Sequence, residues 1–155
     1  MDGITMELGR KTVLDFANLA RLEQGLAVVS TLRADHTVQS SVVNAGVIRH
    51  PMDGTDVVAF VTYGKVKLAN LRVRPRLAVT VRSDWSWSTV EGEAEIVGPD
   101  DPHPAFDAIP VHQLLREIYV AAGGTHEDWD EFDRVMAAER RAGVLVKPVR
   151  SYGIS

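Results

Sequence analysis

The chain of 155 residues is long enough for one domain, and its 45% hydrophobic residues fill one core with little left for a second. The absence of cysteine excludes disulfides, a thiolate nucleophile and cysteine metal sites, and it fits a reducing cytoplasm. The first ten residues hold two acids and no apolar run, and no segment approaches the length of a membrane span. We therefore expect a single soluble, cytoplasmic domain over residues 1–155 that has no membrane partner.

Charge is unevenly distributed along the chain. The net charge is −4, yet residues 57–83 contain no acid and six basic side chains, which are Lys65, Lys67, Arg72, Arg74, Arg76 and Arg82. A local basic cluster within an acidic chain favours a small anionic ligand over nucleic acid, which usually requires a whole basic face. Leu68, Leu71 and Val73 also occupy the places where base-stacking aromatic residues are needed. We expect no nucleic-acid partner.

The first predicted elements are a helix and a hairpin. Residues 12–22 carry apolar side chains at helical spacing, and the pattern stops at Gly25. Residues 26–32 and 38–48 are rich in Val, Ser and Thr and are separated by a polar turn, which predicts two paired strands. Residues 51–54, Pro-Met-Asp-Gly, turn the chain again.

Three further strands are predicted at residues 57–63, 77–81 and 85–97. In the last of them Glu91, Glu93 and Glu95 alternate with Gly92, Ala94 and Ile96, so that one face meets solvent and the other is buried. The basic segment at residues 64–76 then forms a short helix or turn between two strands. The start of a helix beside the end of a strand is a common place for phosphate to bind.

The last third of the chain predicts two helices and a strand. After a proline-rich connection, residues 111–122 show helical spacing and end at a Gly-Gly pair. Residues 125–128, Thr-His-Glu-Asp, resemble a capping box for a third helix, and Pro148 in the strand at 143–151 indicates an edge or a bulge. Six strands joined mostly by short turns favour a mainly β fold, an antiparallel barrel with helical additions.

The basic segment has two readings. Lys65 and Lys67 lie at the start of the predicted helix, where free backbone N–H groups add to their charge, and Asn70 follows as a donor one turn later. An ordinary solvated helix, with Val66, Ala69 and Val73 in the core and the lysines in water, is somewhat favoured by the spacing alone.

Other candidate residues carry weaker signals. Alternation places Trp85 and Trp87 on one face that needs a cover, which is a subunit interface, a flat ligand or a helix of the same chain. The histidines at 103, 112 and 126 share no helical i, i+4 spacing, so we expect no metal site. The nucleophile elbow, the Walker loop and the G-x-G-x-x-G fingerprint are all missing from the sequence.

Several motifs, taken in order, resemble those of a known superfamily. They are Ser-Thr-Leu-Arg-Ala-Asp at 30–35 with Val-Gln-Ser-Ser-Val at 38–42, Lys-Val-Lys-Leu-Ala-Asn-Leu at 65–71 with Arg-Pro-Arg at 74–76, and Trp-Ser at 85–86 with Val-Glu-Gly-Glu-Ala at 90–94. From about residue 26 to 153 the chain is similar to the pyridoxamine 5'-phosphate oxidase-like split-barrel superfamily. Its Trp129-Asp130 pair near Phe132, with Ser-Tyr-Gly at 151–153, is most like the branch that uses the deazaflavin coenzyme F-420.

The resemblance implies a fold, a partner and a site. The fold is a six-stranded antiparallel split β-barrel, and the cofactor lies in a groove between two subunits of a homodimer. By the same resemblance, Lys65 and Lys67 bind phosphate with support from Asn70, Thr62 and Ser41 line the ring and linker, and Trp85 and Ser86 close the site. The chain departs from relatives at Asp35-His36-Thr37-Val38, where they often have Asp-Gly-x-Pro, and at Lys65, where they often have Arg.

The function implied by this branch is an F-420-dependent oxidoreductase. Reduced F-420 passes a hydride to an electron-poor double bond, as in an unsaturated lactone, a quinone or a tetrapyrrole. The acidic tail of F-420 gives Arg72, Arg74 and Arg76 a role, although a solvated turn explains them equally well. Tyr63 and Tyr152 are candidate proton donors, but no catalytic residue is assigned. The alternatives are an FMN enzyme of the same fold and a non-catalytic barrel that binds a cofactor or single-stranded nucleic acid.

Overall fold

The computed structural model describes residues 5–6, 10–103, 106–107 and 109–154. In chain order its elements are β1 (Thr5–Met6), α1 (Arg10–Leu22), β2 (Leu26–Leu32), β3 (Val38–Arg49), β4 (Asp56–Thr62), α2 (Lys65–Val73), β5 (Arg76–Ser83), β6 (Ser86–Val97), α3 (Val111–Ala121), α4 (Trp129–Ala138) and β7 (Ala142–Ile154). The helices and strands expected from the sequence are confirmed, with ends that differ by a few residues, and β1 is an addition.

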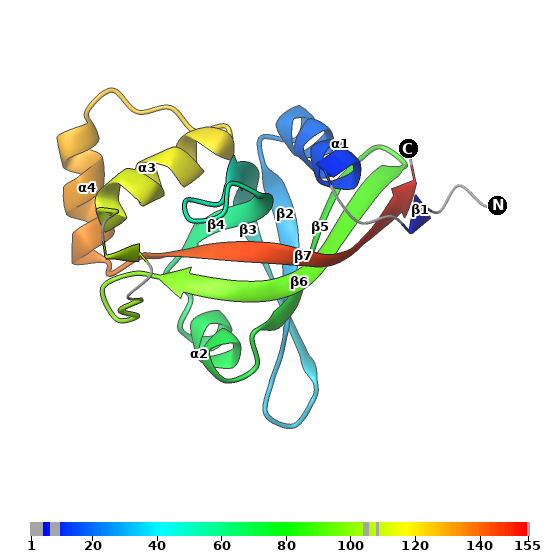
Figure 1. Cartoon of the computed structure of the whole chain (residues 1–155), viewed down its shortest axis with the longest axis horizontal. Coiled ribbons are helices and arrows are strands. Elements are labelled where there is room, and N and C mark those ends of the chain that lie inside the picture. The colour runs from blue at the N-terminus through cyan, green and yellow to red at the C-terminus, as the bar shows by residue number, and fades with distance from the viewer. Residues whose placement is uncertain (1–4, 7–9, 104–105, 108, 155) are drawn as a thin grey trace.

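The strands form a closed antiparallel barrel. Their order is β1-β7-β4-β3-β2-β5-β6, and a further pairing of β7 with β6 closes the circle through β2 to β7. The two-residue strand β1 extends one edge of β7 beyond the part that pairs with β4. Figure 1 shows α1, α2 and the α3–α4 pair on different sides of this barrel. The predicted split-barrel fold is therefore confirmed.

Two apolar clusters hold the helices to the barrel. The first fills the barrel interior, where Phe16 of α1 packs with alternate strand residues such as Val29 and Phe60. The second lies outside the barrel, where Leu114 and Ile118 of α3 cover residues 57 and 59 of β4. Strand β4 is consequently buried on both faces, which explains why its sequence is a continuous apolar run and does not alternate.

Two local predictions need correction, and the one for Pro148 is confirmed. Asp128 caps α4, because its side chain accepts a hydrogen bond from the Glu131 backbone N–H, so Thr125 is not the cap. Strand β7 pairs with β6 along one side, and on its other side it pairs with β4 at residues 142–146 and with β1 at 152–153, so among the described residues no strand pairs with Pro148 on that side. The expected bulge is present: the register shifts at residues 91–92, opposite Pro148. Trp85 lies in the β5–β6 turn and not in the strand.

Among the described residues, no helix combines the length and the apolar character needed to cross a membrane.

Gly46 is the point at which α3 docks on the barrel. A Cβ atom built at Gly46 lies 2.4 Å from the backbone carbon and oxygen of Ala121. We predict that Gly46→Ala lowers the free energy of unfolding by about 1–3 kcal/mol, because α3 has to move away from β3. Urea denaturation of the purified variant checks this value.

Gly64→Ala is the matched control. Its added Cβ meets nothing closer than the Thr62 side chain at 3.4 Å, so its unfolding free energy stays within about 1 kcal/mol of the parent protein. Equal losses in the two variants would contradict the close contact at Gly46.

Candidate functional site

The anion site expected from the sequence lies where β4 ends and α2 begins. Gly64 precedes the helix in an extended conformation, and no side chain caps it. The first turn of α2 contains no acid and carries Lys65 and Lys67. Its free backbone N–H groups and the positive end of the helix dipole therefore add to two ammonium charges.

Lys67 is a buried cation. Its residue is 6% exposed, and its ammonium donates to Thr62 Oγ1 at 3.3 Å and lies 5.9 Å from the centre of the Phe60 ring. Burial lowers the pKa of Lys67 below its ordinary value, and no acid among the described residues offsets that effect. An ammonium has three N–H donors, so Lys67 can donate to further acceptors besides Thr62.

The solvated-helix interpretation fails at this residue. Val66 and Val73, which it placed in the core, are 54% and 70% exposed, whereas Lys67 is buried together with Leu68 and Leu71. Lys65 does face solvent as that interpretation expected. The helix thus turns one lysine into the protein and leaves the other at the rim.

Asn70 links α2 to the barrel. Its Nδ2 donates to Thr31 Oγ1 at 3.0 Å, and Thr31 in turn donates to Gln39 at 3.2 Å. Arg74 donates to the Asn70 oxygen at 3.4 Å and to the carbonyl of Leu32 at 3.0 Å. The amide of Asn70 is therefore engaged within the chain, and its role is to fix α2 against β2.

Ser41 brings a buried hydroxyl group to this end of the barrel. Its buried hydroxyl oxygen has no hydrogen-bond partner among the described residues. It lies two residues from Val43 of the barrel core, on the same face of β3. The β3–β4 register pairs Ala45 with Phe60, so Ser41 and Thr62 extend toward the same end. A buried ammonium with one acceptor and a buried hydroxyl with none fit an oxygen-rich anionic group.

Two of the three arginines that follow Lys67 do not extend the positive site. Arg72 donates twice to Asp101, each time at 2.8 Å, and Arg76 lies 3.6 Å from Glu93. Arg74 makes the intrachain hydrogen bonds described above. Acids that are distant in sequence compensate two of the three charges, whereas Arg74 bonds only neutral oxygens and keeps its charge. The uncompensated positive charge of the segment is therefore that of Lys65, Lys67, Arg74 and the helix start.

Trp85 and Ser86 lie away from these residues within one chain. Strand β5 leaves α2 at Arg76 and runs for eight residues before the turn that carries Trp85, a span of roughly 25 Å. Trp85 is 92% exposed there. Only a second copy of the chain would bring these two residues to the lysine end, so their role in closing the site stays a prediction.

The two tyrosines named as proton donors are also separated. Tyr63 directly follows Thr62, and the Arg141 guanidinium lies 4.1 Å from the centre of its ring. Tyr152 lies on β7 against Trp87, and its hydroxyl donates to Glu91, which raises the pKa of Tyr152 to about 12. Tyr63 therefore borders the lysine site, whereas Tyr152 belongs to the opposite end of β6 and β7.

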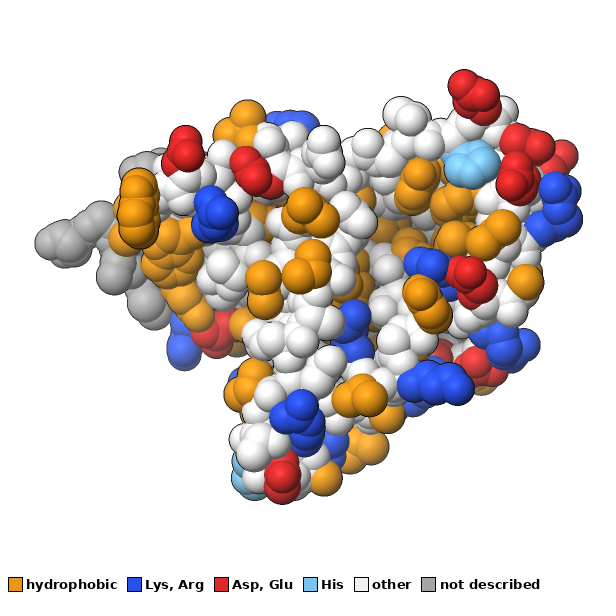
Figure 2. All heavy atoms as spheres, turned by 180° about the vertical axis from the view of Figure 1, so that it is seen from behind, with side chains coloured by type: hydrophobic (Ala, Val, Ile, Leu, Met, Phe, Trp, Pro, Cys, Tyr) orange, Lys and Arg blue, Asp and Glu red, His pale blue; other side chains and the backbone are white. Residues whose placement is uncertain are grey.

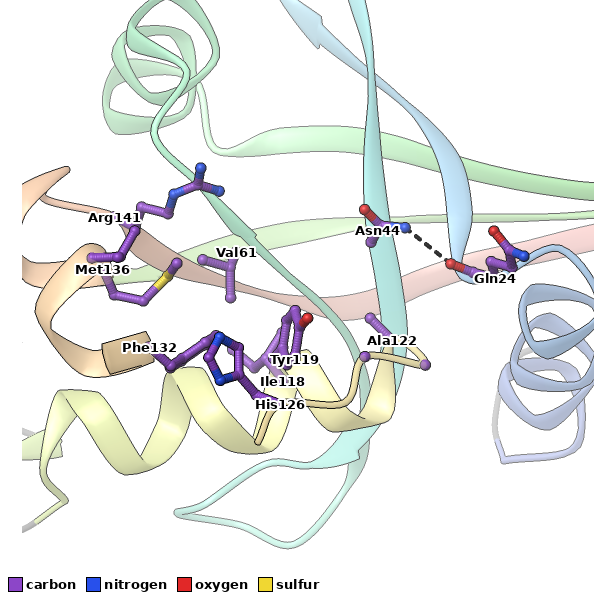
Figure 3. A pocket seen from close by; sticks show the side chains of 13 residues that line it. Gln24, Asn44, Val61, Ile118, Tyr119, Ala122, His126, Phe132, Met136 and Arg141 are labelled. Atoms are coloured by element: carbon purple, nitrogen blue, oxygen red, sulfur yellow. Dashed lines mark hydrogen bonds between the residues drawn. The ribbon is translucent and has the colours of Figure 1, made fainter. Parts of the chain in front are cut away.

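A cavity of about 630 Å³ adjoins the site on the outer side of β4. It lies between α3, α4 and the outer faces of β3 and β4, and Figure 3 shows Asn44, Val61, His126 and Arg141 around it. Viewed from behind, the molecule is hollowed beside the helical pair, with apolar side chains in its depth and Lys or Arg side chains nearby (Figure 2). Because the cavity is formed by distant segments, sequence reasoning missed it.

Comparison with known proteins agrees with this architecture. The sequence matches the family described as pyridoxamine 5'-phosphate oxidase over residues 14–143. The chain belongs to this family. A fold alone does not assign an activity, because one fold can carry many functions.

Solved structures show the same fold at low sequence identity. A conserved hypothetical protein from Mycobacterium tuberculosis is 20% identical with a TM-score of 0.66, covering 97% of this chain and 86% of its own. A protein named F420 reductase is 18% identical with a TM-score of 0.57, covering 88% and 94%. An FMN-binding protein related to pyridoxamine 5'-phosphate oxidase, from Nostoc punctiforme, is 11% identical with a TM-score of 0.59, covering 92% and 81%.

The buried charge of Lys67 has a measurable pH dependence. Since burial holds the folded-state pKa below the ordinary value of 10.5, the folded protein binds fewer protons than the unfolded chain between those two values. The unfolding free energy of the parent protein should therefore rise relative to that of Lys67→Met as pH increases through the folded pKa toward 10.5. Urea denaturation of both proteins across that range checks this.

The same pair of proteins tests the anion site. Inorganic phosphate should stabilise the parent protein and have a smaller effect on Lys67→Met, because the variant lacks the buried ammonium. If the unfolding free energies of the parent and Lys67→Met change in parallel with pH, and phosphate stabilises both proteins equally, Lys67 is solvated and not part of an anion site.

Proposed function

We propose that this protein is an oxidoreductase that binds coenzyme F-420 and reduces an electron-poor double bond of a small molecule. The observation that carries the proposal is the Lys67 ammonium, buried at the start of α2 without an acidic partner among the described residues. Membership of the pyridoxamine 5'-phosphate oxidase family and the structural likeness to a protein named F420 reductase support it.

In this proposal the chain holds the anionic part of the coenzyme. Lys67 and the first N–H groups of α2 bind the phosphate, and Lys65 at the rim contacts the acidic tail or the same phosphate. Thr62 and Ser41 offer hydroxyl groups to the linker and ring, and Asn70 keeps α2 in place. The bound coenzyme supplies the hydride, and the protein supplies orientation.

FMN is the alternative cofactor. The FMN-binding neighbour from Nostoc punctiforme favours it, and its single phosphate would use the same ammonium. The positive charge around Lys67 distinguishes only weakly between F-420 and FMN, because Arg72 and Arg76 lie beside acids of the chain. A direct comparison of the two ligands on the same protein therefore decides between them.

The second subunit of the proposed homodimer has a candidate surface. The outer face of the β2–β3 hairpin carries five exposed apolar side chains: Leu26, Val28, Leu32, Val38 and Val42. Val28 lies directly opposite Val42 in the ladder, and Leu32 lies opposite Val38. The hydrogen-bonded Ser30–Ser40 pair lies between these two apolar pairs on the same face. Exposed apolar side chains gathered on one face of a hairpin are typical of a protein interface. We propose that a second copy of the chain covers it.

Lys67→Ala tests the proposed function. The substitution should weaken F-420 binding by about 1.5–3 kcal/mol, or roughly 10- to 150-fold, because a charge-assisted hydrogen bond to phosphate is lost. Tryptophan-fluorescence titration with F-420 and with FMN on the same preparation measures the loss and ranks the two ligands.

Arg76→Ala is the control. Arg76 is a basic residue of the same segment, is exposed and lies near Glu93, so the affinity of this variant for F-420 should stay within about twofold of the parent's. Unchanged affinity in Lys67→Ala, or equal losses in the two variants, would remove Lys67 from the site.

Val42→Lys tests the proposed dimer. Val42 is 64% exposed in the single chain, so the substitution leaves the fold intact while two added charges meet across the proposed interface. Light scattering after gel filtration should show a dimer for the parent and a monomer for the variant, with weaker F-420 binding. Leu14→Lys, at an exposed position of α1, should remain dimeric. A monomeric parent protein would refute the proposed interface.

A further inference from the structure

The cavity beside β4 has the size and walls of a binding site for a flat organic molecule. Its volume of about 630 Å³ lies within the usual range for small-molecule sites, roughly 300–1,000 Å³. Apolar side chains from β4, α3 and α4 line one part of its wall, namely Val61, Ile118, Phe132, Val135 and Met136, and polar side chains line another part.

Aromatic rings on α3 and α4 give one wall a fixed shape. The Tyr119 and Phe132 ring centres are 4.9 Å apart, and His126 lies 5.7 Å from Phe132. Gly124 lets Tyr119 approach, because a Cβ there would lie 2.5 Å from its ring. Arg116 of α3 donates to Asp133 of α4 and holds the two helices together. This wall is therefore assembled before any ligand arrives.

His126 brings a hydrogen-bond donor to this wall. Its Nδ1 accepts from the Asp128 backbone N–H at 3.1 Å. In the neutral ring an accepting Nδ1 places the proton on Nε2. No described residue accepts a hydrogen bond from that N–H, and Figure 3 shows the ring beside Phe132 at the cavity. The donor lies on the aromatic wall, whereas the other polar side chains of the lining, Gln24, Asn44 and Arg141, come from other segments of the chain. A donor among aromatic rings favours a flat ligand that presents a carbonyl oxygen.

The cavity and the lysine site use consecutive residues of β4. The Thr62 hydroxyl accepts a hydrogen bond from Lys67, while Val61 lines the cavity. Arg141 lies between the two regions, because it borders the cavity and its guanidinium covers the Tyr63 ring. A molecule in the cavity is thus next to, but separate from, the group that Lys67 holds.

From this arrangement we infer that the cavity binds the substrate of the proposed reductase, as a flat, mainly apolar ring system whose carbonyl oxygen accepts a hydrogen bond from His126 Nε2–H. The inference rests on the proposed function and adds its substrate class and a substrate-positioning residue. It requires the coenzyme and the substrate to be bound at the same time.

Two flat bicyclic probes of similar size test the hydrogen bond from His126 by calorimetry. Chromone is a flat bicycle with one conjugated carbonyl, and naphthalene is a bicycle of similar size without it. His126→Phe keeps a flat ring and removes the donor, so it should weaken chromone binding by about threefold to tenfold and leave naphthalene within about twofold. Equal changes for both probes would overturn the role of His126.

A pair of Val→Trp variants tests the location. Val135 lines the cavity and is 40% exposed, so Val135→Trp should abolish binding of both probes without unfolding the protein. Val120 lies on α3 outside this cavity and is 54% exposed, so Val120→Trp should bind both as the parent does. Probe binding that survives Val135→Trp would overturn the assignment.

A competition experiment separates this inference from the proposed function. Saturating F-420 should leave chromone affinity intact or improve it, and stoichiometric displacement would show that the cavity holds the coenzyme ring, which overturns the inference. Binding of F-420 without any binding of chromone would refute the substrate cavity alone. If chromone binds but neither F-420 nor FMN binds the protein, the reductase is refuted and the cavity remains a ligand site.

Discussion

The site depends on one constraint: the ammonium of Lys67 is buried and has no acidic partner among the residues that the structure describes. A cation that is 6% exposed has lost most of its water, and a hydroxyl oxygen and a distant aromatic ring compensate only part of that loss. Of the other basic residues of the segment, Lys65 faces solvent and the arginines make hydrogen bonds within the chain or lie near acids, as Arg72 does with Asp101. The chain thus keeps one buried charge available, which is the expected property of a group that receives an anion.

Strand β4 connects this charge to the rest of the molecule. It is buried on both faces, by the barrel core on one side and by α3 on the other. At its end, successive residues serve different regions, with Thr62 beside Lys67 and Val61 at the cavity. The Asn70–Thr31 hydrogen bond then fixes the following helix against β2. A rigid strand therefore sets the spacing between a site for an anion and a site for a ring system.

Local patterns in the sequence predicted most of the fold, and non-local contacts explain what they missed. The helical stripe around Phe16 and the motif containing Lys67 were sufficient to place α1 and α2. Pro148 was sufficient to predict the bulge in β7, but alternation did not place Trp85, which lies in the β5–β6 turn and not in the strand. Burial of Lys67 also escaped prediction, since helical spacing alone assigned that face to solvent. His126 gave only the signal of a helix cap, and its place on the cavity wall depends on the packing of α3 against α4.

The most direct test of the central claim is an NMR titration of the lysine side chains with and without coenzyme F-420. The chain has only four lysines, at positions 11, 65, 67 and 147, so labelled side-chain signals can be assigned by substitution. The account predicts a lowered pKa for Lys67 in the free protein, which rises when F-420 binds because the phosphate favours the charged form. An ordinary pKa for Lys67 that does not change on addition of F-420 would contradict the account.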